Sequence, residues 1–251
     1  MAFRRLLSAS LLALAATSVL AQPPALVKNV VLVHGLYADG SSWAQVIPLL
    51  QKAGLHVTAV QNPTTSLADD VEATRRALAQ QDGPTVLVGH SYGGMVISEA
   101  GAEAKVAALV YVAARAPDAG EDYPALAKTF PAAPAGKGLV WGSDGFGKLS
   151  EDAFVKDFAG DLDPSLARVY YAVQQPVARA VTTAKTTVAA WRSKPSWYVV
   201  SKQDRTIDPD FQRFMAKRMG AKTTEVDASH VSIISKPEAI AQVILAATRA
   251  P

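Results

Sequence analysis

A serine flanked by glycines is the residue of this chain best placed to act as a nucleophile. Ser91 lies in the string GHSYG at residues 89–93, which is a GxSxG motif. The motif directly follows a β-branched apolar run at 85–88 and opens a helix-like segment at 95–104. On such a strand–turn–helix junction the serine hydroxyl projects outward, and the glycines let neighbouring backbone approach closely. The motif predicts covalent catalysis by Ser91, with a merely structural glycine-serine turn as the alternative.

A serine hydroxyl needs a general base to become a good nucleophile, and the chain has four histidines. His90 adjoins the nucleophile, so its side chain should point away from the serine. His56 lies in an apolar run and is expected as a core or edge histidine, whereas His34 ends the first run and suits an oxyanion loop. His230 follows the last run, where the catalytic rim of a parallel sheet is expected. We therefore predict His230 as the base, with a surface loop histidine as the alternative.

The third member of such a triad is an acid that fixes the histidine tautomer and stabilises the imidazolium. In folds with this serine turn the chain order is serine, acid, histidine, and the acid follows a strand. Asp204 comes just after the apolar run at 197–200 and is the predicted acid. Asp208 and Asp210 look like the cap of the next helix. Asp118 follows an earlier strand and is the alternative acid.

Two backbone amides are expected to form the oxyanion hole, one after the nucleophile and one after the first strand. These are the amides of Tyr92 and Leu36. Gly35 leaves room for the substrate, and Tyr37 is expected to contact it. The walls of an apolar pocket are expected to include Leu36, Tyr37 and Tyr92. Aromatic side chains of a lid should complete it, from among Tyr123, Phe130, Trp141, Phe146, Tyr170 and Trp191.

These residues in this order resemble the plant methylesterase and hydroxynitrile lyase branch of the α/β-hydrolases and its bacterial relatives. The features that carry the resemblance are the segment 34–37 with Trp43, the motif at 89–93, Asp204, and His230 with Pro237 downstream. The resemblance covers most of residues 27–249 and is weakest between 115 and 193. It implies cofactor-free ester hydrolysis by a six-stranded sheet under a helical lid. Because the bacterial relatives differ in substrate, it indicates the chemistry better than the substrate.

Two positions separate the activities of that branch. The resemblance implies that its lyases carry threonine where this chain has Gly35, and lysine where this chain has Val231. A lysine stabilises departing cyanide through its positive charge, which an apolar valine cannot do. Both positions favour ester hydrolysis over cyanohydrin cleavage.

The elements that must position these residues alternate between strands and helices. Six apolar, β-branched runs predict parallel strands at 27–33, 56–60, 85–88, 106–112, 197–200 and 223–226. Helices are expected around 43–50 after Ser41 and Ser42, after the capping pair Ser66 and Asp69, and from Pro237 onwards. This order predicts a mainly parallel sheet with helices on both faces, and the resemblance implies that it is an α/β-hydrolase fold. The strands that precede Gly35 and Ser91 should be neighbours at a topological switch point.

Residues 115–193 interrupt this alternation. Prolines punctuate the first half, a glycine-rich stretch spans 136–147, and helical patterns return at 151–158, 164–174 and 177–191. We expect a mainly helical lid over the carboxyl edge of the sheet, because long insertions there are usually functional. A small second domain without a catalytic role is the alternative.

The N-terminus has the pattern of a secretory signal peptide over residues 1–21. Arg4 and Arg5 precede an apolar run at 6–20, and cleavage is expected after Ala21. The run is shorter than the roughly 20 residues of a bilayer-spanning helix, so an uncleaved anchor is the less favoured alternative. Residues 22–251 then form one secreted or periplasmic domain.

Composition limits the partners. Loss of both leader arginines lowers the formal charge of +3 by two, and no run of basic residues suggests nucleic-acid binding. The chain has no cysteine, so disulfides, a thiolate nucleophile and cysteine metal ligands are excluded. Four scattered histidines do not form H-E-x-x-H, and no cofactor or metal is expected.

The expected partner is therefore a small-molecule ester, and the leading function is carboxylic-ester hydrolysis. Cyanohydrin cleavage and non-catalytic binding of a small apolar ligand are the alternatives. Haloalkane dehalogenase and epoxide hydrolase chemistry need a carboxylate where Ser91 stands.

Overall fold

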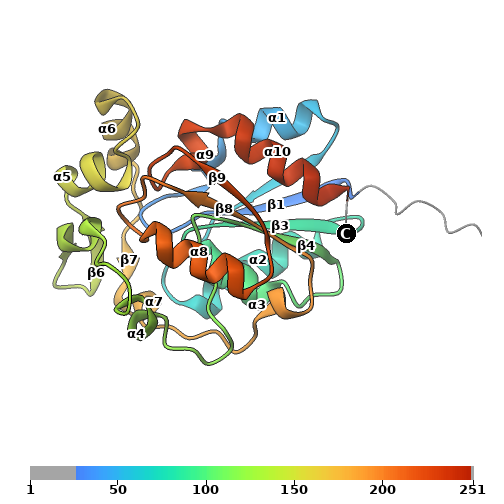
Figure 1. The fold of residues 1–251 in the computed structure, drawn as a ribbon, viewed down its shortest axis with the longest axis horizontal. Coiled ribbons are helices and arrows are strands. Elements are labelled where there is room, and N and C mark those ends of the chain that lie inside the picture. The colour runs from blue at the N-terminus through green and yellow to red at the C-terminus, as the bar shows by residue number, and fades with distance from the viewer. Residues whose placement is uncertain (1–26, 250–251) are drawn as a thin grey trace, which may run out of the picture.

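The computed structural model describes residues 27–249, which form a parallel sheet between two layers of helices (Figure 1). The predicted leader at 1–21 lies outside the described residues. The strand order is β2-β1-β3-β4-β8-β9, and every neighbouring pair is parallel. The strands are β1 (Asn29–Val33), β2 (His56–Val60), β3 (Thr85–His90), β4 (Val106–Val112), β8 (Ser196–Ser201) and β9 (Lys222–Val226). All six predicted strands are confirmed, and no predicted end differs from the observed one by more than two residues.

The predicted topological switch point is also confirmed. From β1 the chain crosses to β2 on one side and then returns to β3 on the other side. In the register of β1 and β3, Val33 lies beside Gly89. The loop that begins at His34 and the serine turn therefore emerge side by side at the carboxyl edge of the sheet, which is where ligands bind in open α/β sheets.

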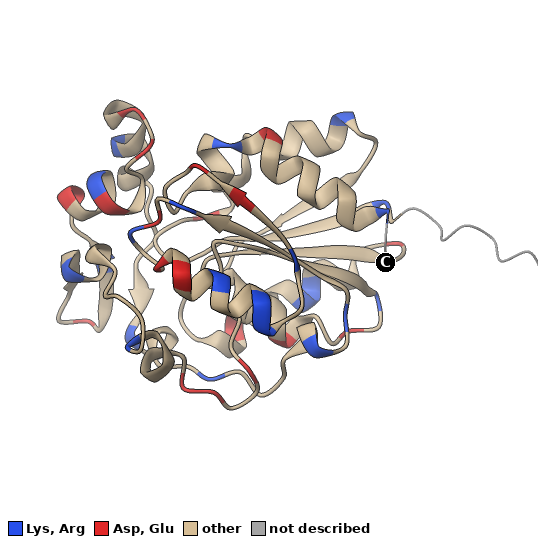
Figure 2. Ribbon diagram, viewed as in Figure 1, with Lys and Arg blue, Asp and Glu red and all other residues tan. Residues whose placement is uncertain are grey.

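Helices cover both faces of the sheet because the central strands are apolar on both sides. One face is covered by α1 (Ile47–Lys52), α9 (Ser232–Ser235) and α10 (Pro237–Thr248), and the other by α2 (Leu67–Ala79), α3 (Gly93–Ala100) and α8 (Pro209–Arg218) (Figure 1). Each face forms its own apolar core. Lysine and arginine alternate with aspartate and glutamate over the helices and loops, without a face of one sign in the view of Figure 2.

Local signals start the helices largely as predicted. The Ser66 hydroxyl accepts from the Asp69 amide at 3.1 Å and caps α2, and α10 begins at Pro237. The predicted start of the helix at Ser41 and Ser42 is wrong. Asp39 caps a short 3-10 helix (η1, Gly40–Trp43) instead, and α1 begins only at Ile47. Pro48 explains the break, because proline has no amide hydrogen and is best placed in the first turn of a helix.

Most of the chain between β4 and β8 lies beyond the carboxyl edge of the sheet, and its last part returns beside α3 (Figure 1). The prediction that this insertion is mainly helical is wrong in part. It contains a three-stranded antiparallel sheet of β5 (Leu139–Trp141), β6 (Phe146–Leu149) and β7 (Val177–Ala178). Its helices are short: α4 (Tyr123–Ala127), α5 (Glu151–Ala153) continued by a π-helical turn (η3, Phe154–Phe158), α6 (Pro164–Ala172) and α7 (Arg179–Thr182).

The missed strands have physical reasons. The turn between β5 and β6 places Gly145 at φ 83°, a conformation that glycine adopts at little cost. That turn converts the glycine-rich stretch into a hairpin. β7 has two residues and is defined by pairing with Phe146 and Gly147, which lie far away in the sequence. Of the expected helix at 177–191, only α7 and the start of a 3-10 turn at Ala190–Arg192 are helical.

Candidate active site

The serine turn is held in a strained conformation at the end of β3. Ser91 has φ 55°, a left-handed conformation that is uncommon for residues other than glycine and that clusters at functional sites. Its amide donates to the carbonyl of Val112, and its carbonyl accepts from the amides of Gly94 and Arg115. A Cβ at position 93 would lie 2.6 Å from the carbonyl oxygen of Val33. Glycine is therefore required where α3 begins against β1.

The structure brings the three predicted triad residues together. His230 Nε2 lies 2.8 Å from Ser91 Oγ, and His230 Nδ1 lies 2.7 Å from Asp204 Oδ2. All three residues are buried. They come from the carboxyl ends of β3, β8 and β9, so the register of the sheet fixes their separation.

The Asp204 carboxylate accepts four hydrogen bonds. Oδ1 accepts from the amides of Thr206 at 2.7 Å and Ile207 at 3.0 Å. Oδ2 accepts from His230 and also from Gln212 Nε2 at 2.7 Å. This oxygen is thereby oriented toward the histidine. Sequence reasoning missed Gln212, and the available signal was a polar side chain one turn inside α8, on the face toward β8.

The alternative acid, Asp118, lies in a different environment. It forms an ion pair with Arg192, and its carbonyl accepts from Thr186 Oγ1. The Arg192 guanidinium lowers the pKa of Asp118 to about 2. Its contacts tie the start of the insertion to the end of the insertion, and the hydrogen bonds of His230 go to Asp204 and Ser91.

Two further histidines support the site without contacting Ser91 Oγ. His90 points away from the serine as predicted, and its Nε2 lies 2.9 Å from the carbonyl oxygen of His230. His34 Nε2 accepts from the Asn62 amide at 2.9 Å, and its Nδ1 donates to the carbonyl of Gly35 at 2.8 Å. Burial lowers the pKa of both imidazoles, so both stay neutral and act as fixed hydrogen-bonding groups. His56 lies exposed in the edge strand β2.

The loop after β1 and the serine turn place two amides next to Ser91. Within residues 27–249, no protein acceptor is recorded for the amide of Leu36 or Tyr92, so both are free for a ligand. A Cβ at position 35 would lie 2.6 Å from Ser91 Cβ and 3.2 Å from Ser91 Oγ. Gly35 is therefore needed for this close approach.

Contrary to the prediction, the Tyr92 ring does not form a wall of the pocket. Its ring is buried beneath the site, and its hydroxyl donates to Asp70 Oδ2 at 2.8 Å. The direction of the turn after Ser91 sends this side chain into the core, while the Tyr92 amide remains at the nucleophile. Burial raises the pKa of Tyr92, which keeps the phenol protonated as a donor.

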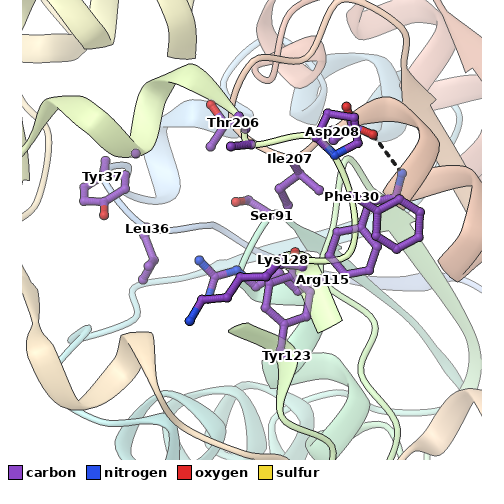
Figure 3. Close-up of a pocket in the computed structure, with 16 residues that line it drawn as sticks. Leu36, Tyr37, Ser91, Arg115, Tyr123, Lys128, Phe130, Thr206, Ile207 and Asp208 are labelled. Atoms are coloured by element: carbon purple, nitrogen blue, oxygen red, sulfur yellow. Dashed lines mark hydrogen bonds between the residues drawn. The ribbon is translucent and has the colours of Figure 1, made fainter. Parts of the chain in front are cut away.

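A cavity of about 380 Å³ opens above Ser91 (Figure 3). Leu36 and Tyr37 lie on one side of Ser91 in this view and Phe130 lies on the other. The remaining lining comes from the insertion, from the loop that follows Asp204 and from the first turn of α8: Arg115, Tyr123, Ala127, Lys128, Pro131, Ala132, Ala133, Gly136, Thr206, Ile207, Asp208 and Phe211. Of the predicted lid aromatics, Tyr123 and Phe130 line this cavity, whereas Trp141, Phe146, Tyr170 and Trp191 do not.

Comparison with known proteins agrees with this architecture. Residues 30–243 match the family described as "Alpha/beta hydrolase family", so the chain belongs to the α/β-hydrolase family. It is 27% identical to Methylesterase 7 of Arabidopsis thaliana, over 87% of this chain and 95% of that protein. It is 26% identical to polyneuridine aldehyde esterase of Rauvolfia serpentina, over 87% of this chain and 94% of that protein.

Solved structures share the fold. The crystal structure of polyneuridine aldehyde esterase aligns with a TM-score of 0.74 at 21% identity, covering 87% of this chain and 98% of that chain. The crystal structure of a pyrethroid hydrolase from Sphingobium faniae JZ-2 aligns with a TM-score of 0.73 at 21% identity, covering 89% of this chain and 98% of that chain. The chain therefore spans nearly the whole length of these relatives.

Proposed function

We propose that this protein is a serine hydrolase that cleaves carboxylic esters of small, fairly apolar substrates through an acyl-serine intermediate. The observation that carries the proposal is the chain of hydrogen bonds from Asp204 through His230 to Ser91 at the floor of an open cavity. The curated relatives named above are esterases, which supports the same reaction.

In the acylation step, Ser91 Oγ attacks the ester carbonyl carbon while His230 Nε2 takes the hydroxyl proton. The negative charge that develops on the carbonyl oxygen is stabilised by the amides of Leu36 and Tyr92. Asp204 holds Nδ1 protonated and stabilises the imidazolium. The ester C–O bond then breaks, and the alcohol leaves with the proton from His230.

In the deacylation step, a water molecule attacks the acyl-serine and gives a proton to His230 Nε2. The tetrahedral intermediate collapses, the bond to Ser91 Oγ breaks, and His230 returns the proton to the serine. The products are a carboxylic acid and the restored enzyme. Neither step calls on a group beyond the side chains and amides already described.

Cyanohydrin cleavage on the same triad is less well supported. Val231, the residue after the histidine, is buried among apolar side chains and offers no charge to departing cyanide. At position 35, a side chain would collide with Ser91 in this backbone conformation. Both positions favour hydrolysis.

The test is a matched assay of purified protein with mandelonitrile and with p-nitrophenyl esters of graded chain length, using Ser91→Ala as the background. We expect ester turnover that exceeds cyanide release and that disappears in the variant. Faster cyanide release would support the lyase. Ligand binding without turnover of any ester would support a binding protein, and either result contradicts the proposal.

We also propose that the mature enzyme works outside the cytoplasm after cleavage behind Ala21, because residues 1–21 have the pattern of a signal peptide. Among residues 27–249, no helix is long and apolar enough to cross a bilayer. N-terminal sequencing of protein from the periplasm and the medium should begin at Gln22. Recovery of only the uncleaved chain, in the membrane fraction, would contradict this proposal.

A further inference from the structure

The cavity above Ser91 contains two cationic side chains that the proposed reaction does not use. Arg115 and Lys128 both line it, and Figure 3 shows them with Tyr123 on the same side of Ser91. Arg115 lies three residues after the end of β4 and starts the insertion, whereas Lys128 directly follows α4. Neither side chain takes part in the hydrogen-bond chain of the triad.

The position of Arg115 is fixed relative to the nucleophile. Its amide donates to the carbonyl of Ser91 at 2.9 Å, so the backbones of the two residues are joined. The guanidinium carbon lies 5.0 Å from the ring centre of Tyr123 and 5.9 Å from that of Tyr92. Two aromatic rings therefore confine the guanidinium close to the reaction centre.

The Arg115 charge has no anionic partner among residues 27–249. Its Nε is buried without a hydrogen-bond partner in this part of the chain. The acids that follow Arg115 most closely along the chain have other partners, because Asp118 pairs with Arg192, Glu121 with Arg218 and Asp122 with Lys185. A partly buried guanidinium with an unused donor is costly unless a ligand pairs with it.

No carboxylate among residues 27–249 forms an ion pair with Arg115 or Lys128. Asp208 is the one described acid that lines the cavity, and its Oδ1 accepts from the amides of Asp210 and Phe211 at the start of α8. Asp204 is buried behind His230. The cavity thus offers a planar donor and an ammonium beside apolar walls.

We infer that Arg115, assisted by Lys128, binds a carboxylate that the substrate carries in addition to its scissile ester. This inference rests on the proposed function and adds one carboxylate to its otherwise apolar substrates. The substrate class is then monoesters of dicarboxylic acids, or hydroxy acids whose hydroxyl group is esterified and whose carboxylate is free. A guanidinium presents parallel donors that match a carboxylate, and such charge-assisted hydrogen bonds are the strong ones. Lys128 is exposed, so it contributes a solvated point charge.

The test compares two forms of each ester substrate. In one form the additional group is a carboxylate, and in the other it is an uncharged primary amide of nearly the same shape, while the scissile ester is the same. One series places the carboxylate on the acyl side, as in monomethyl succinate, glutarate and adipate. The other series places it on the alcohol side, as in the acetate esters of hydroxy acids of the same lengths. For each pair the readout is the ratio of kcat/KM for the carboxylate to kcat/KM for the amide.

We expect the wild-type ratio to reach about ten- to a hundredfold in one of the two series, the size of one charge-assisted hydrogen bond. Arg115→Gln should lower the ratio to about two- to threefold, the share of Lys128. Arg115→Lys should keep more of it because the charge remains without the planar fork. Lys128→Gln should lower it about two- to threefold, as expected for an exposed charge. Arg168→Gln removes an exposed arginine outside the cavity and should leave the ratio unchanged.

The outcomes separate this inference from the proposed function. If the esters that carry the amide are hydrolysed as fast as those that carry the carboxylate in both series, the inference is overturned. Provided that Ser91→Ala abolishes this turnover, the proposed esterase activity stands. A ratio that stays at its wild-type value in both Arg115→Gln and Lys128→Gln would also overturn the inference. Absence of Ser91-dependent turnover of every ester would overturn the proposed function. If Arg115→Gln does not fold, Arg115→Lys and Lys128→Gln decide the matter.

Discussion

The carboxyl edge of the sheet and the insertion that covers it are built in different ways. At the sheet edge, Ser91, Asp204 and His230 follow the parallel strands β3, β8 and β9, and the register of these strands fixes where each of the three loops begins. In the insertion the elements are short, and its three strands pair over three residues or fewer. Register therefore positions the reacting atoms, whereas side-chain contacts position the pocket wall.

Polar contacts join the insertion to the rest of the fold. Thr64 Oγ1 donates to the carbonyl of Pro176 at 2.9 Å, and Arg205 Nε donates to Asp157 Oδ1 at 2.7 Å. Within the insertion, Gln174 pairs with both backbone groups of Leu149. Such a wall can change sequence without disturbing the triad, which explains how one reaction serves different substrates in a family.

The largest expected effect contrasts an acid of the sheet edge with an acid of the insertion. Asp204→Asn should lower kcat/KM by roughly 10⁴-fold, because an amide no longer holds the reactive histidine tautomer. Asp118→Asn should change it by less than about twofold, since Arg192 is its partner. Steady-state kinetics on one ester measures both, and the reverse order would place the acid after β4.

A buried carboxyl beneath the sheet edge should make stability depend on pH. Burial, opposed by the hydrogen bond from Tyr92, raises the pKa of Asp70 from 3.8 to about 6. Between about pH 4 and pH 6 the native state thus keeps a proton that the unfolded chain has lost, so this group makes the free energy of unfolding decrease as pH rises. The change is on the order of 3 kcal/mol.

Asp70→Asn removes this group while keeping an acceptor for the Thr64 amide. Urea unfolding of both proteins at pH 4 and pH 7 measures the effect. When the pH rises from 4 to 7, the free energy of unfolding of the variant should increase relative to that of the wild type. An identical pH dependence in the two proteins would show that Asp70 titrates normally.

Gln212 sharpens the comparison because it orients the triad acid without touching substrate. Gln212→Met keeps the approximate shape but removes the donor to Asp204 Oδ2. Loss of a hydrogen bond to a charged group predicts a decrease of about ten- to a hundredfold in kcat. KM should stay nearly constant, because the cavity wall is unchanged.

The matched control for this positioning role is Gln203→Met, which changes an exposed residue on the loop before Asp204. It should retain wild-type kcat. An equal loss in both variants, or an effect on KM alone, would contradict the role assigned to Gln212.

The smallest effect is expected for the ion pair between Asp118 and Arg192. Arg192 is 61% exposed, and exposed pairs typically contribute less than about 1 kcal/mol. Arg192→Gln should therefore lower the free energy of unfolding by no more than that. Chemical unfolding of the variant checks this, and a loss above about 2 kcal/mol would mean that the insertion is held much as firmly as the sheet edge.

The sequence predicts what is local or set by strand ends. The glycines around Ser91, the strand before it, and the acid and histidine after later strands are each visible as short patterns. Gln212 and the downward ring of Tyr92 are not, because their partners Asp204 and Asp70 lie across the fold. The strand at Val177 is equally hidden, since two residues become a strand only when Phe146 and Gly147 lie beside them.

The most direct test of the central claim is covalent labelling with a fluorophosphonate probe followed by peptide mass mapping. Ser91 should be the residue labelled, because its hydroxyl is 2.8 Å from a histidine that is itself paired with a carboxylate. Labelling should be lost in Ser91→Ala and greatly slowed in His230→Ala. Stoichiometric labelling of another serine, or labelling that survives Ser91→Ala, would contradict the account.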